Sequence, residues 1–214
     1  MIYLFAILIV IIAYLYGCFS TARIVTKSFR SLNVYKIGTG LADTENIYTN
    51  ISKPLGTLVG AIDVAKAYLF LLVVEFVLRF IDIKIINYPS FTVLYSENLM
   101  LIYGISMLIG HCLPFTHRFR GGRGIFTYMG ILAYFAFLPT IISAFIAWII
   151  VLRFKQIRFA QYLIVILPVI LYIIFYTLFH YHKYSPPYFI TLLLGNAIMM
   201  GILNIIVSKK LGEF

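Results

Sequence analysis

The residues with the clearest chemical potential lie at positions 110–124, between two long apolar segments. This stretch begins Gly-His-Cys-Leu-Pro and ends Arg-Phe-Arg-Gly-Gly-Arg-Gly. Arginine supplies planar, permanently charged donors that suit phosphate and carboxylate oxygens. Glycine lets backbone N–H groups approach such an anion, and a helix that begins after Gly124 would add the field of its N-terminus. The stretch therefore predicts a phosphate-binding site.

His111 is the candidate for polarising a substrate oxygen or acting as a general base, because it adjoins the arginines. The alternative is a structural hydrogen bond at the end of an apolar helix. The acyltransferase pattern in which four residues separate a histidine from an aspartate is not met, because Thr116 stands at the aspartate position. Cys18 and Cys112 lack the spacing of a metal site. We expect neither a metal ion nor a cofactor.

A second glycine element, Gly38-Thr39-Gly40, is followed by Asn46. Two glycines around a hydroxyl residue can form a tight turn that faces an anion, with Thr39 donating one more hydrogen bond. An ordinary loop has the same composition. The functional interpretation depends on the predicted position of this element, on the same side of the membrane as the arginines.

Asp63 and Lys66 interrupt an apolar run at residues 55–78. Residues three positions apart share a helix face, so the two charges can neutralise each other. Ionisable groups within the membrane are costly and indicate function. A structural ion pair that orients the helix is the equally supported alternative.

The elements that must position these residues are membrane helices. Hydrophobic residues make up 63% of the 214-residue chain and charged residues only 11%, whereas soluble domains carry about a quarter charged residues. Apolar runs of about the 20 residues that cross a bilayer occupy 2–20, 55–78, 99–115, 162–179 and 188–207. The net charge of +10 resides beside these runs, which favours anionic lipid headgroups over nucleic acid.

The run at residues 125–152 is long for one span, and Pro139 lies near its middle. Two helices broken at Pro139 would leave only Arg79, Lys84 and Lys183 on the outer side, as the positive-inside bias favours. We therefore predict an all-α, polytopic membrane protein of about seven segments, with the N-terminus outside and the C-terminus inside. The first run is expected to be a retained span, and residues 1–214 to form a single domain.

The order of these motifs resembles the PlsY family, the acyl-phosphate:glycerol-3-phosphate acyltransferases of bacteria. The family motif Gly-His-x-Phe-Pro…Phe-x-Gly-Gly-Lys-Gly-Val-Ala-Thr matches residues 110–114 and 119–127. Its first motif, Asp-Ile-Arg-x-x-Gly-Ser-Gly-Asn-x-Gly-Ala-Thr-Asn-x-x-Arg, is similar to residues 33–49. An Asp…Lys pair falls on Asp63 and Lys66, and a remnant of the third motif on Asn204-Ile205 and Glu213.

Several polar positions of the family differ here. Thr39 replaces the serine of the first motif and Arg123 the lysine of the second, so the hydroxyl and the charge remain. Other polar positions are lost, namely those at Tyr35, Leu41, Thr49, Gly201 and Val207. Loss of a charged phosphate contact weakens binding by orders of magnitude, so these changes bear on affinity for the acceptor.

The resemblance implies acyl transfer from an acyl phosphate to the 1-hydroxyl of glycerol 3-phosphate, forming lysophosphatidic acid for phospholipid synthesis. The active site would face the cytoplasm from the bacterial inner membrane, with the acyl chain between spans and no nucleic acid involved. The resemblance assigns catalytic roles to His111, Thr39 and Arg123. It assigns substrate binding to Gly38, Gly40, Asn46, Asp63, Lys66, Arg120, Gly121, Gly122, Gly124, Thr127 and Asn204.

Two alternatives remain open. One is a catalytically weakened paralogue that acts as a lipid-binding or regulatory membrane protein, suggested by the lost polar positions. The other is a small-solute transporter, which is disfavoured because the polar groups gather in loops rather than at the bilayer midplane.

Overall fold

The computed structural model describes residues 2–86, 89–180 and 188–210, and within these ranges the chain forms helices and no strand. The helices are α1 (Ile2–Gly17), α2 (Thr21–Arg30), α3 (Thr44–Asn50), α4 (Lys53–Ile81), α5 (Glu97–Cys112), α6 (Ile125–Phe135), α7 (Phe137–Phe154), α8 (Ile157–Phe179) and α9 (Phe189–Lys210). Short turns of tighter or wider helix are η1 (Val34–Lys36), η2 (Asp82–Ile86), η3 (Pro89–Tyr95) and η4 (Phe115–His117).

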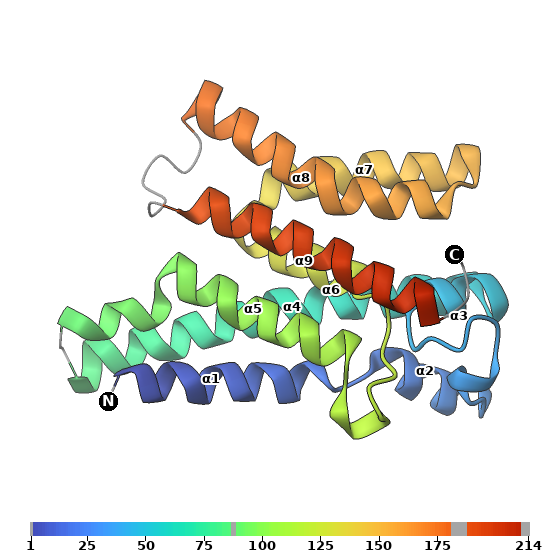
Figure 1. Ribbon diagram of the computed structural model, residues 1–214, viewed down its shortest axis with the longest axis horizontal. Helices are drawn as coiled ribbons and strands as arrows, with labels where there is room; N and C mark the ends of the chain where they lie inside the picture. Colours follow the sequence, from blue (N-terminus) through green and yellow to red (C-terminus); the bar gives the residue numbers. More distant parts are fainter. Residues whose placement is uncertain (1, 87–88, 181–187, 211–214) are drawn as a thin grey trace.

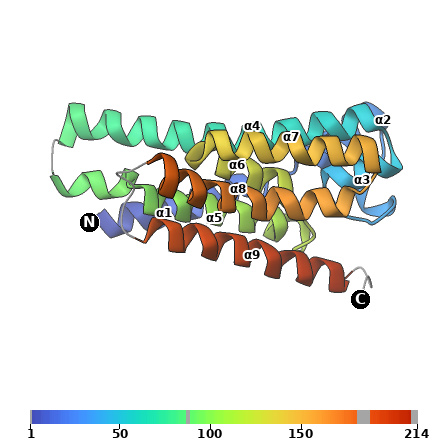
Figure 2. The same cartoon turned by 90° about the horizontal axis from the view of Figure 1, so that it is seen from above.

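The long helices run along a common direction and pack as a bundle (Figures 1 and 2). The most extensive helix pairs are α1 with α5, α4 with α6, and α7 with α8. Two glycines allow α1 and α5 to cross closely, because a Cβ on Gly17 would collide with the Met107 carbonyl and a Cβ on Gly110 with the Tyr14 carbonyl. Gly110 is therefore a packing residue of the fold.

Five helical segments are long and apolar enough to cross a membrane. They are Ile2–Arg30, Glu97–His117, Phe137–Phe154, Ile157–Phe179 and Phe189–Lys209. Large apolar side chains are exposed along four of these segments, whereas Glu97–His117 lies largely inside the bundle, and such exposure suits lipid rather than water around the bundle. The chain is thus an all-helical integral membrane protein, while the count of seven segments stays a prediction.

The run at residues 125–152 is two helices, as predicted. The break lies at Ala136, between α6 and α7, so the predicted break at Pro139 is wrong by three residues. Pro139 lies in the first turn of α7, where the missing N–H of proline costs no helical hydrogen bond. Ala136, with φ −140° and ψ 64°, leaves the helical conformation instead.

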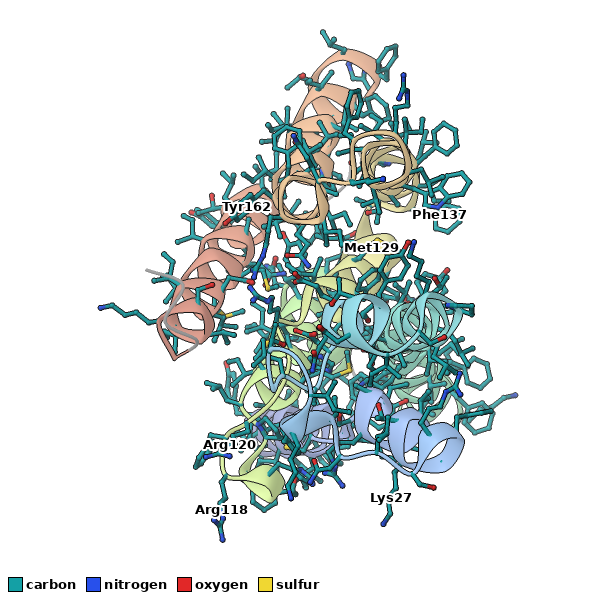
Figure 3. All side chains as sticks on the ribbon, turned by 90° about the vertical axis from the view of Figure 1, so that its right-hand side faces the viewer. Lys27, Arg118, Arg120, Met129, Phe137 and Tyr162 are labelled. Atoms are coloured by element: carbon teal, nitrogen blue, oxygen red, sulfur yellow. The ribbon has the colours of Figure 1, made fainter. Side chains whose placement is uncertain are left out.

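The reversal at Ala136 gathers basic residues at one end of the bundle. This end, at the right of Figures 1 and 2, holds α2, α3, the turn between α7 and α8, and the last turn of α9. Lys27, Arg118 and Arg120 point outward from it (Figure 3). The last turn of α4 and η2, which carry Arg79 and Lys84, lie at the opposite end (Figure 1), and Lys183 and Glu213 lie outside the described residues.

Candidate functional site

Asn46 organises the first glycine loop, which joins α2 to α3. Its Oδ1 accepts a hydrogen bond from the Thr39 N–H at 3.1 Å, and its Nδ2 donates to the carbonyls of Ile37 (3.0 Å) and Leu41 (2.9 Å). The side chain is fully buried. Because loop backbone groups occupy both ends of its amide, Asn46 holds the shape of the loop, a role different from the substrate contact that its sequence position predicts.

The loop itself needs its two glycines. Gly38 and Gly40 have φ values of +51° and +69°, a region that strains residues with a Cβ. The Thr39 hydroxyl accepts a hydrogen bond from the Leu41 N–H at 3.4 Å. Thr39 is partly exposed, and its hydroxyl remains able to donate a hydrogen bond.

The second glycine loop packs directly on the first. Ala42 donates its N–H to the Gly121 carbonyl at 3.3 Å, and the Tyr35 hydroxyl donates to the Arg120 carbonyl at 3.0 Å. Gly122 donates its N–H to the His111 carbonyl at 3.4 Å. A Cβ on Gly122 would lie 2.8 Å from the Ala42 carbonyl oxygen. The two motifs, distant in sequence, therefore form one structural unit.

Arg123 is buried, with only 2% of its side chain exposed, and carboxylates face it. Its Nε lies 3.4 Å from Glu45 Oε2 and 3.8 Å from Asp43 Oδ2. Glu45 also lies 3.5 Å from Arg158, from Oε1 to Nε, and its Oε2 accepts a hydrogen bond from Gln161 Nε2 at 2.8 Å. Arg123 is therefore already neutralised by acids of α3 and its N-cap.

Asp43, Glu45, Arg158 and Gln161 were not predicted from the sequence to belong to the site. A signal was present, because Asp43 and Glu45 fall between the glycines of the first motif and Asn46. Acids are unexpected in a loop proposed to bind phosphate. Their partners, in the loop before α6 and on α8, are far away in sequence, and only the folded chain pairs them.

A small polar cavity lies against these charges. Its volume is about 10 Å³, roughly the space of one water molecule. Buried polar atoms of its lining that make no hydrogen bond within the described chain are Asp43 Oδ2, Thr44 Oγ1 and His111 Nδ1. The residues that line this polar cavity are Asp43, Thr44, Glu45, Asp63, His111, Arg123, Gly124, Ile125, Phe126 and Gln161.

Burial raises the pKa of the Asp43 carboxyl from its usual 3.8 to about 7. The Asn46 N–H, which donates to Asp43 Oδ1 at 2.9 Å, lowers the pKa in part, and the nearby Glu45 charge raises it. Asp43 therefore changes its charge beside Arg123 near neutral pH.

Asp63 and Lys66 tie α4 to the junction between α1 and α2. Asp63 Oδ1 accepts a hydrogen bond from the Thr21 hydroxyl at 2.8 Å, and Lys66 Nζ donates to the Phe19 carbonyl at 2.9 Å. Their own separation is 3.7 Å. Asp63 also lines the polar cavity, whereas Lys66 does not, so the geometry favours a structural role for Lys66.

The remaining predicted residues divide into two groups. Asn204 on α9 reaches the site, since its Nδ2 donates to the Arg123 carbonyl at 3.5 Å, and Thr127 is fully buried in the first turn of α6. Arg120 contributes its carbonyl to the loop contact, but its side chain is exposed and points away from the bundle (Figure 3). Arg120 is thus outside the cavity in this conformation.

An apolar groove of about 310 Å³ adjoins the polar cavity. Helices α3, α4, α6, α7 and α8 all contribute to it. Thr44, Glu45, Phe126 and Gln161 line both spaces, and the remaining residues of the groove are Tyr48, Thr57, Met129, Ala144, Ala147, Trp148, Val151, Leu152, Ile157, Ala160 and Ile164. A charged cavity and an apolar groove therefore lie side by side in this helical membrane protein.

Comparison with known proteins identifies the family. Residues 7–209 match the family model described as glycerol-3-phosphate acyltransferase, and the chain belongs to this family. It is 26% identical over 168 residues to the glycerol-3-phosphate acyltransferase of Mycoplasma mobile, covering 78% of this chain and 66% of that protein. It is 30% identical over 128 residues to that of Thermoanaerobacter pseudethanolicus, covering 60% and 56%. The matches thus span less than two thirds of these relatives.

The fold is also similar to crystal structures of PlsY, an integral membrane glycerol 3-phosphate acyltransferase. Its glycerol 3-phosphate form superposes with a TM-score of 0.70 and 21% identity, over 96% of this chain and 88% of that chain. Its lysophosphatidic acid form gives a TM-score of 0.67 over the same shares. These likenesses establish a common fold.

Proposed function

We propose that the protein transfers an acyl group from an acyl phosphate to the 1-hydroxyl of glycerol 3-phosphate, forming lysophosphatidic acid. The observation that carries this proposal is the position of buried Arg123, in a glycine loop beside His111, where it lines the polar cavity that adjoins the apolar groove. The substrates fit this layout, because both carry a phosphate and one carries an acyl chain. Membership of the glycerol-3-phosphate acyltransferase family supports the same activity.

In this reaction the acceptor hydroxyl oxygen attacks the acyl carbonyl carbon. The bond from that carbon to the phosphate oxygen breaks, and inorganic phosphate leaves carrying the proton of the hydroxyl. The acyl phosphate is already activated, so the protein's task is to position two anionic groups and to screen their repulsion. Arg123 and the N–H groups of the glycine loops are suited to that task, and His111 and Asn204 to orienting the acceptor.

The acyl chain would occupy the apolar groove. Apolar side chains of α6, α7 and α8 supply most of its lining. Its volume of about 310 Å³ lies at the lower end of the range of small-molecule pockets. An acyl chain bound in the groove would bring its activated carbonyl next to the four residues that line both the groove and the polar cavity.

We place the chain in the bacterial inner membrane as a single domain over residues 1–214. The basic end of the bundle, which carries the glycine loops, would face the cytoplasm with the C-terminus. The N-terminus would lie outside.

A second candidate is a weakened paralogue that binds lipid or regulates without turnover. The ion pairs of Arg123 with Asp43 and Glu45 favour it, because a neutralised arginine attracts phosphate less than an open one. Activity separates the two candidates.

The deciding experiment supplies purified protein with palmitoyl phosphate and radiolabelled glycerol 3-phosphate. We expect lysophosphatidic acid from the native chain, loss of at least a hundredfold in Arg123→Ala, and little change in Arg118→Ala, the matched exposed arginine. No product from folded native protein at high acceptor concentration would reject the active enzyme and leave the paralogue.

A further inference from the structure

Glu45 stands in the wall between the polar cavity and the apolar groove. Both spaces are lined by Thr44, Glu45, Phe126 and Gln161. The hydrogen bond from Gln161 Nε2 to Glu45 Oε2, at 2.8 Å, closes this wall between α3 and α8. A molecule with a phosphate head and an acyl chain must occupy both spaces, so this contact lies across its path.

The polar cavity is too small for a phosphate group as the structure stands. Its volume of about 10 Å³ holds about one water molecule. The Glu45 carboxylate occupies the neighbourhood of Arg123 Nε at 3.4 Å, and Asp43 Oδ2 lies at 3.8 Å. The space beside the guanidinium that an anionic substrate requires is therefore taken by an anion of the protein.

Glu45 has a second cation to hold it away from Arg123. Its Oε1 lies 3.5 Å from Arg158 Nε, and 40% of the Arg158 side chain is exposed, compared with 2% for Arg123. Leaving a buried charge without a partner is strongly unfavourable. When a phosphate replaces the carboxylate on Arg123, the buried arginine and the displaced glutamate each keep a counter-charge. The exchange of counter-ions therefore leaves no buried charge unpaired.

We propose that Glu45 is a displaceable counter-ion that determines which anions reach Arg123. In the closed state its carboxylate holds Arg123 and Gln161 and separates the cavity from the groove. The phosphate of an acyl phosphate takes its place on Arg123, Glu45 stays with Arg158, and the opened wall lets the acyl chain enter the groove. This inference rests on the proposed acyl transfer and adds a specificity-determining residue to it.

One consequence is discrimination between substrates. Inorganic phosphate gains only the contact with Arg123 when it displaces Glu45, whereas an acyl phosphate also buries its chain in the groove. Glu45 thus suppresses occupation of the site by anions that carry no chain.

The test measures binding of inorganic phosphate to the full chain in detergent, with the variant Glu45→Gln. The amide can still accept the hydrogen bond from Gln161 but no longer neutralises Arg123. We expect the dissociation constant for phosphate to fall at least tenfold and the KM for palmitoyl phosphate to fall with little change in kcat. The matched control, Glu75→Gln, removes a carboxylate paired with Arg79 on α4, away from the cavity.

A second variant should change the phosphate affinity in the opposite direction, and the residue it replaces does not line the polar cavity. Arg158→Gln removes the alternative partner of Glu45, so the carboxylate stays on Arg123 and phosphate binding should weaken. An unchanged or weaker phosphate affinity in folded Glu45→Gln, or an unchanged affinity in Arg158→Gln, overturns the inference.

The acyl-transfer assay separates this inference from the proposed function. If phosphate binding shifts as expected but no variant makes lysophosphatidic acid, the acyl-transfer function fails and the counter-ion role of Glu45 stands. If the native chain makes lysophosphatidic acid and Glu45→Gln alters neither phosphate affinity nor KM, the function stands and the counter-ion role fails.

Discussion

The Ala42 N–H donates a hydrogen bond to the Gly121 carbonyl at 3.3 Å and so joins the two glycine loops edge to edge. The loops come from the two motifs on which the resemblance to the family is strongest. Because each loop forms part of the surroundings of the other, a change of shape in one must alter the position of Asp43 or Arg123 in the other.

This junction predicts the effect of adding a methyl group to Gly122. A Cβ there would lie 2.8 Å from both the Ala42 carbonyl oxygen and Asp43 Cβ, and crowding of this kind costs about 1–3 kcal/mol. Gly122→Ala should lower the melting temperature in detergent and reduce acyl transfer. Gly195→Ala is the control, because a Cβ there meets nothing within 4 Å. Equal melting temperatures for the two variants would refute the close junction.

The Asp63–Lys66 pair predicts a non-additive effect on stability. Asp63→Ala leaves the buried Lys66 without its counter-charge and should cost about 3–5 kcal/mol. Removing both charges in Asp63→Ala/Lys66→Met should cost less than Asp63→Ala alone, which a double-mutant cycle on the unfolding free energy would measure. Simple addition of the single effects would show that the pair contributes no coupling.

The Asp43 carboxyl predicts a pH dependence of anion binding. Its pKa is raised by burial to about 7, so it is neutral below that pH and negatively charged above it. Affinity for sulfate, whose own charge is constant in this range, should fall as the pH rises from about 6 to about 8. The charged and titratable groups around Asp43 are Glu45, Asp63, His111, Arg123 and Arg158.

Asp43→Asn isolates this titration, since an asparagine still caps α3 but stays neutral. The fall in sulfate affinity should be reduced in that variant. The same raised pKa means that protons bind the folded chain more tightly, so Asp43 contributes stability that is lost as the pH rises from 3.8 towards about 7. A pH profile identical in the native chain and in Asp43→Asn would assign the effect to another group.

The apolar groove predicts control of acyl-chain length. Ala144 lines the groove, and Ala144→Phe would fill part of its volume. We expect KM to rise for palmitoyl phosphate and to rise less for an acyl phosphate with eight to ten carbons. Ile146→Phe is the control, because it adds a phenylalanine to α7 on the exposed face of the helix. A chain-length profile unchanged by Ala144→Phe would place the acyl chain elsewhere.

The sequence predicted the parts of this molecule that local rules determine. Helical runs, the reversal within residues 125–152 and the start of a helix after Gly124 all follow from hydropathy and chain conformation. The exact break was displaced from Pro139 to Ala136, because a proline fits the first turn of a helix as well as it ends one. His111, Arg123, Asp63 and Gly124, which the sequence singles out, all line the polar cavity, and their roles in binding and catalysis stay predictions.

The charge state of the site could not be predicted in the same way. Glu45 meets Arg123 and Arg158, which lie 78 and 113 positions later, and no local pattern encodes such pairing. Asn46 was expected to contact substrate, whereas its amide is used by the loop that contains Thr39. Polar residues in a motif can serve a ligand or the loop around it, and the folded backbone decides between these roles.

The most direct test of this account is a structure determined with an unreactive analogue of an acyl phosphate bound. We predict a phosphate oxygen within hydrogen-bonding distance of the Arg123 guanidinium and the Glu45 carboxylate on Arg158. Phosphate held instead by the exposed side chains of Arg118 and Arg120, with the contact between Arg123 and Glu45 intact, would contradict it.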